Sequence, residues 1–299
     1  MTSLTSALAE RVVLLDGGFA TRLERRGHDL SDALWSARLL LDEPDAIRAT
    51  HADFFAAGAE VAITASYQVS ESGFLAAGRT VAEAREALAR SVRLARAAAA
   101  QFDGERWVAA SIGPYGASLA DGSEYRGDYG VSVAELRAWH RPRLELLAEA
   151  GADLFACETI PCLAEAEALA AEIALLDVPA WLSLTTVGDR TRMGEPAEDA
   201  YALAAEVPAI VALGANCCDP HDAAAVVGAV AARRPVVFDP TSGESWDAVA
   251  RSWVGEADGG SDLAAGVQGW LDAGVRALGG CCRVTPDQIS EMRAVVDHR

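Results

Sequence analysis

The sequence predicts an α/β fold of the (β/α)8 barrel class, built as a single domain over residues 1–299. Eight short apolar runs recur along the whole chain, and a longer stretch with helical periodicity follows each of them. The length of 299 residues accommodates the roughly 250 residues that such a barrel needs, plus insertions. Hydrophobic residues make up 51% of the chain, which allows a large core.

The eight runs have the composition of buried parallel strands, since they are rich in Val, Ile, Leu and Ala and are bounded by turn residues. In chain order they are VVLLD (12–16), VAITAS (61–66), WVAASIG (107–113), DLFACET (153–159), AWLSLTT (180–186), AIVALGANC (209–217), PVVFDP (235–240) and VRALGGCC (275–282). Strands alternating with helices over this length favour a closed parallel barrel.

The stretches between the runs predict helices that begin and end at ordinary capping and breaking residues. Clear examples are residues 43–58, 80–102, 131–151 and 285–299. A doubly wound sheet is the alternative, but the first run is followed only by a Gly-Gly pair and not by a GxGxxG fingerprint.

Two segments, 114–132 and 241–262, are longer than ordinary loops, and both follow predicted strands. In barrel enzymes the loops after the strands build the active site. We therefore expect the functional site at this end of the barrel.

The charge balance excludes two classes of partner. The chain has 44 acidic and 25 basic residues and a formal net charge of -19, so it would repel nucleic acid and anionic lipid. The first residues lack a basic segment leading into a long apolar one, and no later segment is apolar enough to cross a bilayer. We expect a cytoplasmic protein with neither partner; its oligomeric state, monomer or small homo-oligomer, is left open.

The six cysteines are expected to be free thiols or metal ligands, since disulfides are rare in a reducing compartment. Two adjacent pairs, Cys217–Cys218 and Cys281–Cys282, end the sixth and eighth strands, which both neighbour the seventh strand in a closed barrel. Catalytic zinc takes three protein ligands and keeps one open position. We predict Zn2+ bound by Cys217, Cys281 and Cys282; small buried hydrophobes are the alternative.

The charge of this site indicates its chemistry. Three thiolates leave a zinc site formally monoanionic, which makes it a poor Lewis acid for a carbonyl but a good place to hold a thiol as thiolate. Alkyl transfer to sulfur is therefore favoured over hydrolysis, and the histidines form no HExxH motif. Cys157 and Cys162 are interpreted as core residues.

Seven motifs, in this order along the chain, resemble those of the homocysteine S-methyltransferases. They are DGGFATRLERRG (16–27), ALW (33–35), ITASYQ (63–68), YRGDY (125–129), ETIP (158–161), GANC (214–217) and GGCC (279–282). The resemblance implies a zinc-dependent barrel that methylates homocysteine to methionine. The donor in this family is S-methylmethionine or S-adenosylmethionine, betaine, or a folate, depending on the branch.

The resemblance also implies a homocysteine site. Asp16 and Glu158 match the carboxylates that hold the homocysteine ammonium, and Gly17 and Ser66 match positions beside its carboxylate. Asn216 ends the sixth strand and is assigned to the same substrate site. Taken singly, Asp16 is also typical of a turn and Glu158 of a helix start.

A sulfonium or quaternary ammonium donor needs aromatic walls, because ring faces attract a cation that carries no hydrogen-bond donors. Phe19 and Trp35 match aromatic positions near the donor in the betaine branch, and Tyr125 and Tyr129 lie in the long third loop. Ordinary packing of these four rings is the alternative.

Donor choice depends on the branch. Residues 239–244 read DPTSGE where the resemblance leads us to expect YPNSGE, so Asp239 and Thr241 depart from the pattern. The chain has neither the further domains of the folate branch nor the extension of the betaine branch, so the compact sulfonium-using branch is expected. A betaine-type enzyme, a non-catalytic zinc or thiol-sensing barrel protein and a dehydrogenase-like enzyme are the alternatives.

Overall fold

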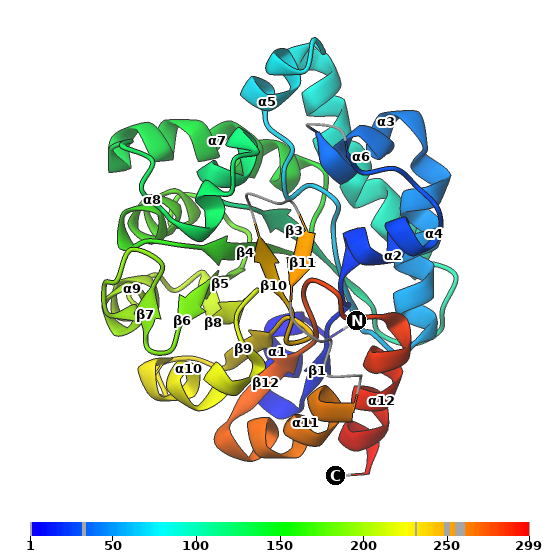
Figure 1. Cartoon of the computed structure of the whole chain (residues 1–299), viewed down its shortest axis with the longest axis vertical. Coiled ribbons are helices and arrows are strands. Elements are labelled where there is room, and N and C mark those ends of the chain that lie inside the picture. The colour runs from blue at the N-terminus through cyan, green and yellow to red at the C-terminus, as the bar shows by residue number, and fades with distance from the viewer. Residues whose placement is uncertain (1, 32–33, 231, 248–251, 255–260, 299) are drawn as a thin grey trace.

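The structure is a computed structural model that describes residues 2–31, 34–230, 232–247, 252–254 and 261–298. Eight parallel strands form one sheet in the order β1-β12-β9-β8-β5-β4-β3-β2, and a parallel bridge between Leu15 and Val61 joins its two edges. Helices surround the strands (Figure 1). The predicted (β/α)8 barrel is confirmed, and the doubly wound alternative is wrong because such a sheet stays open.

Each predicted run contains a strand of the barrel, although several strands are shorter than the runs. The strands are β1 (Val13–Leu14), β2 (Val61–Ile63), β3 (Trp107–Ile112), β4 (Leu154–Ile160), β5 (Ala180–Leu184), β8 (Ile210–Asn216), β9 (Val236–Asp239) and β12 (Val275–Leu278). The last strand stops before its Gly-Gly pair because the chain there passes close to β1: a Cβ on Gly279 would lie 2.6 Å from the Cβ of Leu15.

One long helix follows nearly every strand. These helices are α4 (Pro44–Ala56), α6 (Val81–Ala99), α7 (Val133–Glu149), α8 (Leu163–Ile173), α9 (Ala197–Ala205), α10 (Ala223–Val230), α11 (Ser261–Ala273) and α12 (Pro286–Asp297). Short helices α2 (Phe19–Arg25) and α3 (Leu39–Asp42) precede α4, and α5 (Glu71–Ala76) precedes α6. No helix in the described ranges is long and apolar enough to cross a membrane.

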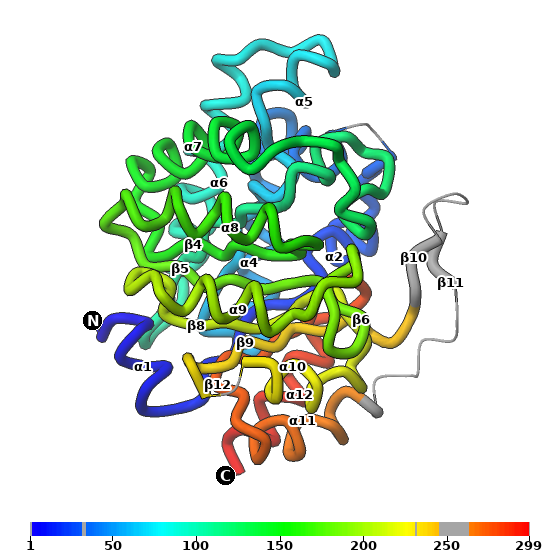
Figure 2. Tube along the Cα trace, turned by 90° about the vertical axis from the view of Figure 1, so that its left-hand side faces the viewer, coloured from blue at the N-terminus to red at the C-terminus, as the bar shows by residue number. Residues whose placement is uncertain are grey.

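Side chains alternate between two cores. Residues such as Trp107, Trp181 and Val237 fill the inside of the barrel, while their neighbours pack outward against the helices. Helix α1 (Leu4–Glu10) adds Leu4 and Leu8 to the inner core. Figure 2 shows α1 at the opposite end of the barrel from β6 (Thr186–Val187), so one end is closed by apolar packing. This helix was not predicted from the sequence.

The two long loops lie after β3 and β9. The first holds the 3-10 helices η2 (Tyr115–Leu119) and η3 (Ser123–Tyr125), and the second holds β10 (Ser245–Asp247) and β11 (Ser252–Val254). Parts of the predicted 241–262 loop lie outside the described residues. Cys157 and Cys162 are buried, as expected for core residues.

His51 of α4 gives the fold a pH-dependent stability. Its ring is fully buried, stacks near Phe19 and has no hydrogen-bond partner among the described residues. Burial lowers the pKa of His51 from 6.5 to about 3. Between these two pH values the His51 side chain is mostly protonated in the unfolded chain and mostly neutral in the folded chain. The contribution of His51 to the free energy of unfolding should therefore fall by about 2 kcal/mol between pH 7 and pH 5, whereas the raised pKa of Glu158 acts in the opposite direction.

Urea unfolding at both pH values measures this loss. The difference in the free energy of unfolding between wild type and His51→Leu should change by about 2 kcal/mol between the two pH values, whereas His298→Gln, which changes an exposed histidine, should follow the wild type at both. An unchanged pH dependence in His51→Leu would contradict the assignment.

Candidate metal and substrate site

Three cysteines meet at the mouth of the barrel. Strands β8 and β12 both pair with β9, and this brings the sulfur atoms of Cys217, Cys281 and Cys282 within 4.8 Å of one another. Cys217 has a positive φ of 48°, which is unfavourable for a residue with a side chain and is found mostly at functional sites. The strand order expected from the sequence is therefore the one that gathers these thiols.

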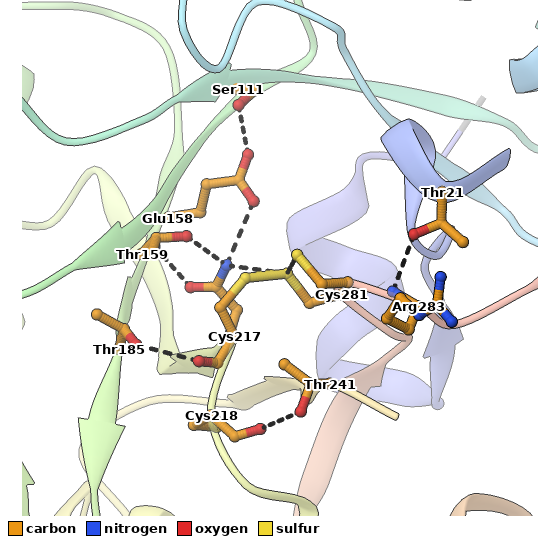
Figure 3. The surroundings of a disulfide bond; sticks show 12 residues. Thr21, Ser111, Glu158, Thr159, Thr185, Cys217, Cys218, Thr241, Cys281 and Arg283 are labelled. Carbon is orange, nitrogen blue, oxygen red and sulfur yellow. Dashed lines mark hydrogen bonds between the residues drawn. A yellow bond between two sulfur atoms is a disulfide. The ribbon is translucent and has the colours of Figure 1, made fainter. Parts of the chain in front are cut away.

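Two of the three cysteines form a disulfide. Cys217 and Cys281 are joined, with their Cα atoms 5.4 Å apart (Figure 3), and Cys282 is free. The expectation that none of the cysteines would be paired is wrong for this form, because the strand ends place the two Cα atoms within the roughly 4.4–6.8 Å that a disulfide spans. Metal binding through all three sulfurs requires this bond to be reduced.

The donor set fits a thiolate-bound metal. The Sγ atoms of Cys281 and Cys282 are 3.9 Å apart, and tetrahedral zinc with bonds of about 2.3 Å needs sulfur atoms about 3.8 Å apart. Burial raises the pKa of the Cys282 thiol to about 12, so a nearby cation is needed to keep that sulfur ionised at neutral pH. Three soft ligands of this kind are typical of zinc sites that keep one open position.

Three buried carboxylates lie close to one another in the same mouth. Asp16 is 2% exposed, Asp239 4% and Glu158 9%. Burial raises the pKa of each, that of Glu158 to about 7, and the negative charge of Glu158 raises the pKa of both aspartates further. No described residue forms an ion pair with any of them. Buried carboxylates without a cation fit a cationic ligand such as an ammonium group.

Glu158 is held in place by its neighbours. The Ser111 hydroxyl donates to one of its carboxylate oxygens, and Asn216 Nδ2 lies 3.4 Å from the other. Asn216 also pairs with Thr159, accepting from its backbone N–H at 2.6 Å and donating to its hydroxyl at 2.9 Å (Figure 3). Asn216 therefore links β8 to β4 and orients Glu158, while its contact with substrate stays a prediction.

Thr159 was missed by the sequence analysis. Its φ of 60° is rare for a β-branched residue and places it in the conformation that meets the Asn216 amide. Nothing in the local sequence signals such a backbone angle.

Gly17 and Ser66, the residues expected beside the homocysteine carboxylate, are both tightly packed. A Cβ on Gly17 would lie 2.8 Å from the Phe54 ring, so only glycine fits there. The Ser66 side chain is fully buried, and its hydroxyl donates to the Ser111 carbonyl at 2.8 Å. Their contact with a ligand carboxylate stays a prediction.

The two tyrosines of the third loop have different surroundings. Tyr125 lines a cavity beside Cys217 and lies near enough to the Cys282 thiol for the two groups to act on each other electrostatically. Tyr129 instead packs against Tyr115, with ring centroids 5.4 Å apart. The structure brings Tyr125 to the cysteines and places Tyr129 in a separate aromatic cluster.

Phe19 and Trp35 lie in the segment that connects β1 to β2. Phe19 begins α2 and stacks on His51 with ring centroids 4.5 Å apart. Trp35 begins the 3-10 helix η1 (Trp35–Arg38) with a φ of 51° and is half-buried against the core. Both have packing roles, and their contact with a donor stays a prediction.

The cavity beside Cys217 has a volume of about 350 Å³. Its polar wall includes Arg192, Asp222 and Glu244, none of which the sequence analysis singled out. Arg192 follows β7 (Arg190–Thr191) in a short hairpin whose sequence resembles an ordinary turn, so no motif marked it. Thr241 also lines the cavity and donates from its backbone N–H to the Cys218 carbonyl at 3.0 Å.

Known proteins share both the sequence and this architecture. The sequence profile of the family described as Homocysteine S-methyltransferase matches residues 13–296. Homocysteine S-methyltransferase of Escherichia coli (strain K12) is 45% identical over 293 residues, which cover 95% of this chain and 94% of that protein.

Two solved structures of the homocysteine methyltransferase MmuM from Escherichia coli are also similar. The oxidized form has a TM-score of 0.85 and 41% sequence identity, and the match covers 95% of this chain and 96% of the MmuM chain. The metallated form has a TM-score of 0.85 and 42% identity, with 96% of each chain covered. With a family match over nearly its whole length, this chain belongs to the homocysteine S-methyltransferase family of enzymes.

Proposed function

We propose that this enzyme transfers a methyl group from a sulfonium donor, S-methylmethionine or S-adenosylmethionine, to the thiol of homocysteine, giving methionine. We propose zinc as its metal, with Cys217, Cys281 and Cys282 as ligands. The proposal rests on three cysteines whose sulfur atoms lie within 4.8 Å of one another. They lie next to buried carboxylates that form no ion pair with any described residue. A metallated form of the similar MmuM structure supports a metal here.

The metal would supply a site where a thiol loses its proton at neutral pH. Asp16 and Glu158 bind the homocysteine ammonium, and Ser111 and Asn216 keep Glu158 oriented toward it. The homocysteine sulfur attacks the donor methyl carbon in line, the bond from that carbon to the sulfonium sulfur breaks, and the donor leaves as a neutral thioether. Alignment of the two reacting groups in the mouth lowers the entropic cost of their encounter.

The remaining assignments are part of the same proposal. Gly17 and Ser66 lie beside the homocysteine carboxylate, and Phe19 and Trp35 lie on the donor side. A cytoplasmic location fits the need to keep three thiols reduced.

An assay with alternative donors tests the proposal. Reduced, zinc-loaded enzyme is incubated with homocysteine and, separately, S-methylmethionine, S-adenosylmethionine and betaine, and methionine is measured. We expect methionine from a sulfonium donor. Methionine from betaine alone would support the betaine-type alternative, and stoichiometric metal without methionine from any donor would support a non-catalytic thiol protein.

Removal of the metal should abolish turnover reversibly. After reduction the enzyme should hold one zinc per chain by mass spectrometric metal analysis, lose it to a strong chelator together with activity, and regain both on addition of zinc. Oxidised enzyme, in which Cys217 and Cys281 are joined, should bind no zinc because its sulfurs are not thiolates. Full activity of the chelated enzyme would contradict the role of the metal.

A further inference from the structure

Arg192 is a half-buried cation that no carboxylate of the described residues contacts, although the charge of Asp222 acts on it from the same wall. Its guanidinium donates to the Thr185 hydroxyl at 3.1 and 3.2 Å and lies 3.4 Å from the Cys217 carbonyl, and the Tyr125 ring centroid is 5.6 Å away. No described residue forms an ion pair with it. Because no carboxylate contacts the guanidinium, it keeps hydrogen-bond donors for a direct ion pair with an anionic ligand.

The position of Arg192 identifies which ligand supplies the anion. Arg192 lines the cavity beside Cys217, whereas Asp16, Glu158 and Asp239 are not part of that wall. The ammonium and carboxylate of homocysteine are attached to one carbon atom, so the molecule held by Asp16 and Glu158 keeps its carboxylate near them. The anion at Arg192 therefore belongs to the second substrate.

The geometry points to Arg192 as the residue that binds the carboxylate of the methyl donor, so that the donor is an amino acid sulfonium lying in this cavity. This inference rests on the proposed function. A guanidinium binds a carboxylate through two parallel hydrogen bonds, and the Tyr125 ring beside it offers a face for the sulfonium cation.

The rest of the cavity matches the same donor. Asp222 lies in the wall with Arg192, and its Oδ2 accepts only the Gly188 N–H, at 3.1 Å, among the contacts found in the described part of the chain. It offers an acceptor for the N–H groups of the donor ammonium, whereas the quaternary ammonium of betaine has no N–H to donate. The volume of about 350 Å³ is near the lower end of the roughly 300–1,000 Å³ of small-molecule sites, so a compact donor such as S-methylmethionine fits better than one that carries a nucleoside.

Direct binding measurements test the assignment independently of turnover. Calorimetry on reduced, zinc-loaded enzyme compares S-methylmethionine with its carboxamide, in which the carboxylate is replaced by a neutral amide. Arg192→Gln should raise the Kd of S-methylmethionine about 10- to 100-fold, as loss of a charge-assisted hydrogen bond does. It should leave the Kd of the carboxamide nearly unchanged, while Arg190→Gln, on the exposed neighbouring arginine, should bind both ligands like the wild type.

Two further readouts distinguish a role of Arg192 in binding the donor from a role in holding the Cys217 backbone in place. Zinc content and the KM for homocysteine should be unchanged in Arg192→Gln. An equal loss of affinity for S-methylmethionine and its carboxamide, or a rise in the homocysteine KM without a change in donor Kd, would overturn the assignment. If the wild type binds S-methylmethionine through Arg192 but forms no methionine, the proposed function fails and the binding assignment stands.

Discussion

Cys281→Ser should remove both the metal and methyl transfer. The serine hydroxyl does not ionise at neutral pH, so only Cys217 and Cys282 remain as thiolate ligands, and two are too few for a stable catalytic site. The homocysteine thiol, with a pKa of about 8.5, then stays mostly protonated. We expect zinc content close to zero and kcat lower by about 1,000-fold or more, measured by metal analysis and by methionine formation.

Cys162→Ser is the matched control for this variant. Cys162 is buried and occupies the N-cap of α8, where serine is a favoured residue, and it lies outside the three-cysteine cluster. It should keep zinc and turnover. Full activity of Cys281→Ser without zinc would remove the proposed mechanism.

Glu158→Gln should weaken homocysteine binding strongly. The Gln side chain keeps the size of Glu158 and can still contact Ser111 and Asn216, but it has no charge for the substrate ammonium. Loss of one partner of a buried charged pair costs about 2–5 kcal/mol, so kcat/KM for homocysteine should fall by about 30-fold or more. Steady-state kinetics at saturating donor measures this effect.

A substrate analogue makes this test specific to the ammonium. With 4-mercaptobutyrate, which is homocysteine without its amino group, wild type and Glu158→Gln should have similar kcat/KM values. Glu167→Gln, on an exposed position of α8, should behave as wild type with both thiols. If Glu158→Gln lost activity equally with both thiols, its role would be structural.

Much of the site could be predicted because it depends on strand order and on residues at strand ends. A closed parallel barrel gathers the ends of all its strands at one mouth, so Cys217, directly after β8, and Cys281, after β12, had to lie on either side of β9. The position of Cys157 inside the fourth apolar run also predicted that it would be buried. The same reasoning could not reveal the disulfide, which depends on distances between particular Cα atoms.

By itself the sequence determined the barrel, the family, the three thiols and two of the three carboxylates at the mouth, since apolar periodicity and motif order are properties of the chain read along its length. Only the tertiary structure decided which side chains face one another. It placed Arg192 beside Cys217 and Tyr129 away from it, and it set the left-handed backbone at Thr159 and Cys217. These features arise from packing between segments far apart in the chain, and such contacts leave no periodic or local signal in the sequence.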